Sequence, residues 1–77
     1  MAQRQTATRH AQPLALLTIP ATAGRLGSSD MHVYRLIAAG ELRAVDISQP
    51  GARRSKTRIR SDDLDEYIDR QTRVAAP

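Results

Sequence analysis

The residues best suited to binding chemistry gather in one cationic stretch near the carboxyl end. Residues 51–60, GARRSKTRIR, hold five cations and no acid, and the next seven residues, SDDLDEY, hold four carboxylates. Arginine and lysine at this density attract phosphate groups and other anions. The abrupt change of sign indicates that two different structural elements meet at Ser61.

The rest of the chain shows the same division of charge. Residues 1–61 hold ten cations against three acids, whereas residues 62–77 hold two cations against five acids, within a net charge of +4. We therefore expect one face to bind a polyanion and the carboxyl-terminal segment to lie outside that face.

The composition argues against an enzyme. Cysteine is absent and the two histidines lie in different segments, which excludes disulfides and thiolate zinc sites and suggests no nucleophile with its base. We expect no catalytic residue, no metal, no cofactor and no small-molecule ligand. The longest apolar run, LALLTI, is too short to cross a bilayer, so we expect no membrane association and a cytoplasmic location.

Two helix signals follow each other closely. Thr18 is a good N-cap, Pro20 suits a first helical turn and Gly27 provides a stop, which predicts a helix of about two turns. Ser28 or Ser29 can cap a second helix that ends at Gly40 in the left-handed conformation. The expected buried positions are Ile19, Ala23 and Leu26 in the first helix and Val33, Leu36 and Ile37 in the second. Two short helices joined by about three residues that include a glycine are typical of a helix-turn-helix.

The next residues predict a hairpin. ELRAVDIS, residues 41–48, alternates as a half-buried strand, with Arg43, Val45 and Ile47 on one side. QPGARRSK then forms a turn, and TRIR, residues 57–60, returns with Ile59 inward and its arginines outward. The hairpin is thus a two-stranded antiparallel wing with a cationic tip and outer face.

A third helix is expected from Ser61, which would be its N-cap. Asp62 and Asp63 would lie in the first turn, where the helix dipole favours negative charge. Its buried stripe would be Leu64, Tyr67 and Ile68. We interpret the acidic residues of this helix as capping and solvated groups, with a binding site for a partner protein as the alternative.

These elements predict a small α+β winged helix-turn-helix over residues 14–73. Residues 1–13, which hold two arginines and end in a proline, are expected to be a flexible basic arm, and residues 74–77 a frayed tail.

From Leu17 to Ile68 the chain resembles the excisionase family of winged-helix DNA-binding proteins, which is related to the DNA-binding heads of MerR-type regulators. The similar pieces, in the family's order, are LLTIPATAGRLG, SSDMHVYRLIAAGEL, AVDI and RIRSDDLDEYI. The resemblance implies a recombination directionality factor of a phage or mobile element, acting on DNA in a bacterial host cell. Such a protein binds repeated duplex sites cooperatively, bends the DNA and directs an integrase towards excision without cleaving DNA itself.

Two other functions remain open at this stage. A small winged-helix transcriptional repressor would need the same DNA-binding surface, and an adaptor would use the acidic helix to bind a protein. RNA is less favoured because only two aromatic residues are present to stack on unpaired bases.

The geometry of a helix in the major groove predicts which side chains touch DNA. The amino-terminal part of the second helix reaches base edges, and the expected readers are Met31, His32 and Arg35, the arginine pairing with guanine. Methionine also fills gaps in cores, so Met31 could be structural instead.

The remaining expected contacts are with phosphates and the minor groove. Backbone contacts are expected from Thr18, Arg25 and Tyr34, although Tyr34 could instead pack on the first helix. The wing contacts are expected from Arg53, Arg54, Lys56 and Arg58.

Overall fold

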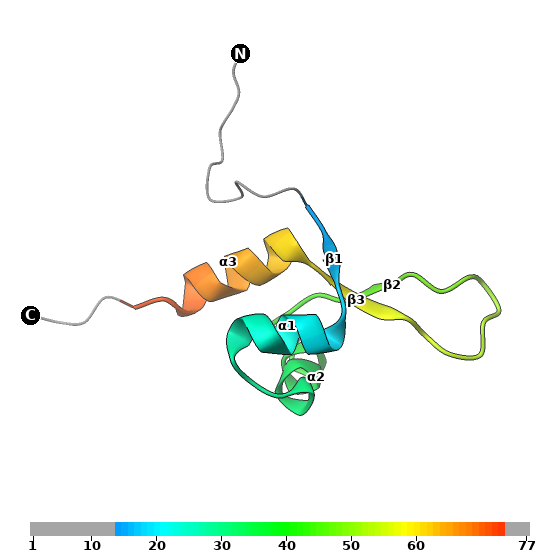
Figure 1. Ribbon diagram of the computed structural model, residues 1–77, viewed down its shortest axis with the longest axis horizontal. Helices are drawn as coiled ribbons and strands as arrows, with labels where there is room; N and C mark the ends of the chain where they lie inside the picture. Colours follow the sequence, from blue (N-terminus) through cyan, green and yellow to red (C-terminus); the bar gives the residue numbers. More distant parts are fainter. Residues whose placement is uncertain (1–13, 74–77) are drawn as a thin grey trace, which may run out of the picture.

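A computed structural model describes residues 14–73. Three helices and three short strands follow one another in this range (Figure 1): β1 (Leu16–Leu17), α1 (Ile19–Leu26), α2 (Asp30–Ala38), β2 (Val45–Asp46), β3 (Thr57–Arg60) and α3 (Ser61–Gln71). The strands form an antiparallel sheet in the order β1-β3-β2. The predicted α+β winged helix-turn-helix is confirmed. The predicted arm and tail, residues 1–13 and 74–77, lie outside the described residues.

The two helices of the helix-turn-helix begin at side chains that cap them. The Thr18 hydroxyl oxygen accepts a hydrogen bond from the Ala21 N–H (3.1 Å), and the Ser29 hydroxyl oxygen accepts one from the His32 N–H (3.1 Å). Each bond satisfies an N–H that has no partner inside its helix. Of the two candidate serines, Ser29 is therefore the cap of α2.

Glycines end both helices in the left-handed conformation that other residues rarely adopt. The φ angle is 64° at Gly27 and 76° at Gly40. After α2 the Gly40 N–H donates to the Ile37 carbonyl (3.0 Å) and the Glu41 N–H donates to the Leu36 carbonyl (2.9 Å), which is the Schellman pattern. The turn between α1 and α2 is only residues 27–29, and the two helices pack against each other.

The core is small and draws on α1, α2, β3, α3 and the segment before β2. Its buried apolar side chains are Ile19, Ala23, Val33, Leu42, Ile59 and Leu64. Thr22 is also buried, and its hydroxyl donates to the Thr18 carbonyl (2.9 Å), so α1 can bury this polar residue without an unpaired group.

The expected apolar stripes are only partly buried. Leu26, Leu36, Ile37 and Tyr67 pack around the core as half-buried residues. Ile68, expected in the buried stripe of the last helix, is exposed, so that prediction is wrong. The core is too thin to cover this turn of α3. No helix within residues 14–73 is long and apolar enough to cross a membrane.

A third strand, β1, was not expected from the sequence. Leu16 pairs with Arg60 and Leu17 pairs with Ile59. Ser61 extends this pairing, because its N–H donates to the Ala15 carbonyl (2.8 Å) and its hydroxyl oxygen accepts from the Ala15 N–H (2.9 Å). The prediction that Ser61 caps α3 is therefore wrong. The N-cap is Arg60, which makes no side-chain capping bond, and β3 passes into α3 without a loop.

This arrangement predicts the effect of Ser61→Ala on stability. The substitution leaves the Ala15 N–H without its acceptor in a partly buried place, and we expect the free energy of unfolding to fall by about 1–2 kcal/mol. Urea denaturation followed by circular dichroism measures this change. The control is Ser28→Ala, since Ser28 is exposed and its hydroxyl has no partner within residues 14–73. Equal stabilities of the two variants would contradict the assigned bond.

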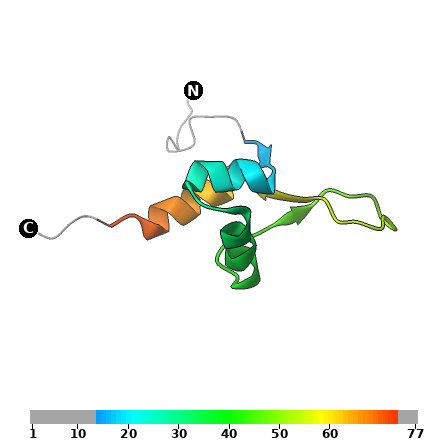
Figure 2. The same cartoon turned by 60° about the horizontal axis from the view of Figure 1, so that its bottom comes forward.

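The first strand of the wing is shorter than the sequence predicts. Of the expected strand at residues 41–48, only Val45 and Asp46 pair with β3, while Leu42 enters the core and Ile47 is exposed. The return strand TRIR, in contrast, has the predicted bounds, and Ile59 is fully buried. The segment between β2 and β3 protrudes from the body, on the side opposite to the carboxyl end of α3 (Figures 1 and 2).

Candidate nucleic-acid interface

The predicted base-reading side chains of α2 are exposed to solvent. Met31, His32 and Arg35 are all exposed, while Val33 between them is completely buried. Met31 is 58% exposed, so its side chain does not fill a gap in the core. The three side chains thus lie on a face of the helix that is free to approach another molecule.

A groove brings other predicted residues together from separate elements. It has a volume of about 490 Å³ and lies between the amino end of α1, the middle of α2 and the base of the wing. Its walls include Thr18, Tyr34, Lys56 and Arg58. Tyr34 is 50% exposed here, so its hydroxyl can donate to an anion in the groove.

The structure does not bring Arg25 into this groove. Arg25 is exposed in the last turn of α1 and lines a second groove of about 440 Å³, next to α3. His32 lines the same second groove, together with Tyr67 and Ile68. Arg25 and His32 are therefore near each other but separate from the groove at the wing.

The cationic groups at the tip of the wing have no partner among residues 14–73. Arg53, Arg54 and Lys56 are exposed, and their guanidinium and ammonium groups form no hydrogen bond or ion pair with this part of the chain. The same holds for Arg35 on α2. Arg58 differs, because it is half-buried in β3 and its guanidinium donates to the Thr57 carbonyl (2.9 Å). The tip cations and Arg35 are thus available to bind an anion.

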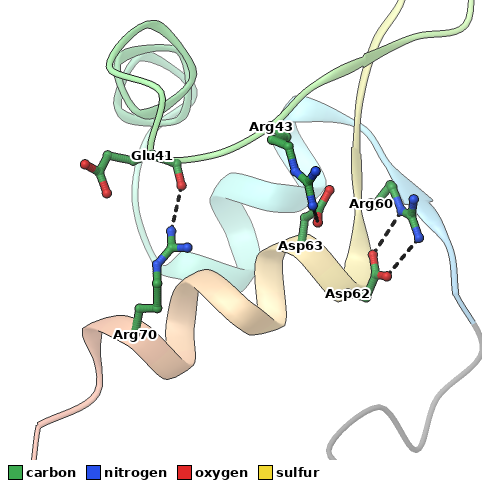
Figure 3. A network of polar contacts seen from close by, with 6 residues as sticks. All are labelled: Glu41, Arg43, Arg60, Asp62, Asp63 and Arg70. Carbon is green, nitrogen blue, oxygen red and sulfur yellow. Dashed lines mark hydrogen bonds and ion pairs between the residues drawn. The ribbon is translucent and has the colours of Figure 1, made fainter.

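A second set of arginines is held within the fold, around α3 (Figure 3). Arg60 donates two hydrogen bonds to the Asp62 carboxylate (3.1 and 2.9 Å), and Arg43 donates to Asp63 (3.0 Å). Arg70 donates to the backbone carbonyl of Glu41 (2.8 Å) and lies over the ring of Tyr67.

These contacts correct two predictions from the sequence. Arg60 was expected on a free cationic face of the wing but is paired with Asp62. The first acids of α3 were expected to be solvated, yet the Asp63 side chain is only 11% exposed and bonds to Arg43. The acidic helix therefore neutralises the nearby arginines, and the unpaired cations named above remain on α2 and the wing.

The pKa of Asp62 shows how closely it is coupled to Arg60. Partial desolvation raises the pKa of this carboxyl, but the hydrogen bond and charge of Arg60, with help from the backbone N–H groups of Asp63 and Asp62, lower it by more. The result is a pKa below the ordinary value. Asp62 is thus ionised at neutral pH and retains its ion pair.

A carboxylate that the sequence reading overlooked closes the base of the wing. One oxygen of Asp46, Oδ1, accepts hydrogen bonds from the Ser48 N–H (2.9 Å), the Ser48 hydroxyl (2.7 Å) and the Lys56 N–H (3.0 Å). We call this arrangement the Asp46 clasp. An aspartate two residues before a serine, ahead of a proline and glycine, is the signal of a side-chain turn that could have revealed it.

The clasp predicts a pH-dependent transition in the wing. The Ser48 hydroxyl, the Ser48 N–H and the Lys56 N–H all bond to the charged form of Asp46 and lower its pKa, although partial desolvation opposes them. Because the pKa is lowered on folding, the ionised carboxylate contributes its full stabilisation above the ordinary aspartate value of about 3.9, and this contribution is lost as the pH falls through the lowered value.

Nuclear magnetic resonance can follow this transition. The amide signals of Ser48 and Lys56 should titrate together, with a midpoint below the ordinary aspartate pKa, and Asp46→Asn should abolish the shared transition. A midpoint at or above the ordinary value would be inconsistent with the clasp.

A helix-turn-helix whose second helix exposes the side chains predicted to read bases, flanked by a protruding cationic hairpin, defines a winged helix-turn-helix protein of the DNA-binding class. Comparison with protein families agrees, because the family model described as a helix-turn-helix domain matches residues 16–72. The chain belongs to this helix-turn-helix domain family. Comparisons with curated proteins and with solved structures gave no significant match. The fold and the family together support sequence-specific binding of double-stranded DNA.

Proposed function

We propose that the protein is an excisionase of a phage or mobile element, which binds duplex DNA and directs an integrase towards excision in the bacterial host cell. The observation that supports DNA as the ligand is the distribution of charge: the side chains of Arg35 on α2 and of the cations at the wing tip are unpaired among residues 14–73. Three arginines around α3 are instead bonded within the fold, namely Arg43, Arg60 and Arg70. The matched family, a DNA-binding family that includes excisionase-like proteins, supports the finer assignment.

In this proposal α2 enters the major groove. Its amino-terminal turn carries the positive end of the helix dipole, and Arg35 can donate two hydrogen bonds to a guanine, with Met31 and His32 on neighbouring bases. Sequence preference therefore comes from α2.

The groove at the base of the wing takes the DNA backbone. Tyr34, Lys56 and Arg58 line it beside the amino end of α1, where Thr18 is the cap. A phosphate placed there meets two cations and a hydroxyl donor. The tip of the wing, with Arg53 and Arg54, follows the backbone into the minor groove. Arg25, at the other end of α1, is proposed to contact a more distant phosphate.

DNA bending needs more than one copy of so small a protein. A smooth bend costs on the order of 1–6 kcal/mol, and copies bound side by side on repeated sites share this cost. The proposed surfaces for self-association are residues 1–13 and the exposed side of α3, which includes Glu66.

An excision assay tests this function directly. Footprinting on the DNA that flanks the gene first gives the binding site, the repeat spacing and the number of copies. The purified protein is then added to the integrase of the same element and a substrate that carries both attachment sites. We expect excision to depend on the protein and integration to be reduced. Specific DNA binding without any stimulation of excision would contradict the proposal and favour a repressor.

A salt titration of duplex binding, made with the same purified protein, distinguishes DNA binding from an adaptor role. Affinity for a duplex should fall linearly with the logarithm of salt concentration, because each bound phosphate releases counterions. Absence of duplex binding at low salt would favour the adaptor.

A further inference from the structure

The Asp46 clasp is the last connection between the two sides of the wing before its tip. In the strand ladder Asp46 pairs with Thr57, and the Ile47 N–H then donates to the Lys56 carbonyl (3.0 Å). The bond from the Lys56 N–H to Asp46 Oδ1 (3.0 Å) completes this end of the hairpin. Both backbone polar groups of Lys56 are therefore held by the opposite strand.

The tip beyond this point has little support of its own. Within residues 48–55 the fold has the hydrogen bond of a local turn, in which the Ala52 N–H donates to the Gln49 carbonyl (3.0 Å). This bond does not connect the two sides of the hairpin. The direction in which the tip leaves the body is thus set at its base.

The clasp adjoins the groove beside α1, because Lys56 belongs to both. Lys56 and Arg58 lie on its wing side, and Thr18 and Tyr34 lie on its helix side. Lys56 follows directly from the clasp, and Arg58 lies two residues further along β3, opposite Val45. If the base of the hairpin opened, these two cations would move away from Tyr34.

We propose that Asp46 is a positioning residue for DNA binding, whose carboxylate holds the base of the wing so that Lys56 and Arg58 stay in the groove opposite Tyr34. This inference rests on duplex binding and not on the excisionase role. An acid beside a DNA-binding surface repels the polyanion, so removing it should strengthen binding if charge alone matters. Removing the clasp should weaken binding, because the two cations lose their position. Geometry and charge therefore predict opposite signs.

Asparagine separates these two effects. All three donors of the clasp bond to Oδ1, so Asp46→Asn keeps an oxygen acceptor at this position without the charge. Asp46→Ala removes the acceptor together with the charge. Glu41→Ala is the matched charge control, because Glu41 is exposed, does not line this groove, and its side chain has no partner among residues 14–73.

The probe is a mixed-sequence DNA duplex, and the readout is fluorescence anisotropy over a series of salt concentrations. We expect Asp46→Ala to bind about fivefold more weakly than the wild type, with a salt slope smaller by about 1, since roughly one phosphate contact is lost. Asp46→Asn and Glu41→Ala should bind at least as tightly as the wild type.

A second variant guards against a folding defect in Asp46→Ala. Ser48→Ala removes one donor of the clasp without changing the charge or the core, and we expect weaker binding in the same direction, by about twofold. Circular dichroism reports whether the helices are intact in each variant. Wild-type or tighter binding by both Asp46→Ala and Ser48→Ala would overturn the proposal. A wild-type protein that binds the duplex but fails in excision would leave this comparison unaffected.

Discussion

Simultaneous replacement of Arg53 and Arg54 by alanine is expected to weaken binding to every DNA duplex by about a hundredfold at low salt, whatever the sequence. Both side chains are exposed on the tip of the wing and have no partner among residues 14–73. They therefore have no interaction to lose in the free protein, and their charge is fully available to phosphates. Each contact with a phosphate releases counterions, so the salt slope should fall by about 2 in the double variant.

The matched control uses two arginines that the fold already holds. Arg43 bonds to Asp63, and Arg70 bonds to the Glu41 carbonyl. Replacing these two arginines with alanine changes the net charge by the same amount as the double variant at the wing tip. We expect this control to retain most of the affinity in anisotropy titrations on the same duplex. Equal losses in the two double variants would mean that net charge, and not the wing, determines binding.

Arg35→Ala is expected to act on specificity instead. A bidentate pair with guanine contributes about 1–3 kcal/mol of discrimination, which corresponds to a loss of roughly fivefold to 150-fold at the specific site. Affinity for mixed-sequence DNA should change little by comparison. Arg35 is exposed in the middle of α2 and has no partner among residues 14–73, so its removal should leave the core intact.

The decisive quantity is the ratio of affinities for the footprinted site and for mixed-sequence DNA. Arg35→Lys is the informative companion, because lysine keeps the positive charge but not the planar pair of donors. Arg35→Lys should retain the wild-type affinity for mixed-sequence DNA but should not restore the wild-type ratio of affinities. The same loss on both duplexes for Arg35→Ala would contradict a role in reading bases.

Local signals were sufficient to predict the helix-turn-helix. Caps and stops act within a few residues, so Thr18, Gly27 and Gly40 have in the structure the roles that their types suggest. The return strand Thr57–Arg60 was equally clear, because alternation places Ile59 inward. The DNA contacts proposed for these elements remain predictions.

Interactions between distant parts of the chain could not be predicted. β1 is only two residues long, which is too short for an alternating pattern in the sequence. It forms because β3 lies beside it and supplies the hydrogen-bond partners. Ser61 has the sequence context of a helix cap, but the N–H of Ala15 takes its hydroxyl oxygen. Local capping preference was overridden here by a pairing across the sheet.

The grouping of the candidate site residues also depends on tertiary structure. The sequence placed Thr18, Tyr34 and Lys56 in separate elements, and the groove that joins them appears only when α1 packs beside the wing. The sequence likewise placed Arg60 on the free outer face of the wing, although Asp62 at the start of α3 binds its guanidinium. Charge patterning thus predicted the sign of the surface but not which cations remain available.

The clasp at Asp46 makes the wing tip an exchangeable part. Residues 46 and 56 are joined across the hairpin, so the segment between them forms a closed loop. Changes in the length or composition of this loop should therefore have little effect on the helices. Doubling the length of such a loop costs only about 0.6 kcal/mol in closure entropy. Related proteins could therefore acquire longer, shorter or differently charged tips while retaining one helix-turn-helix, and an engineer could graft a new tip between the same two residues.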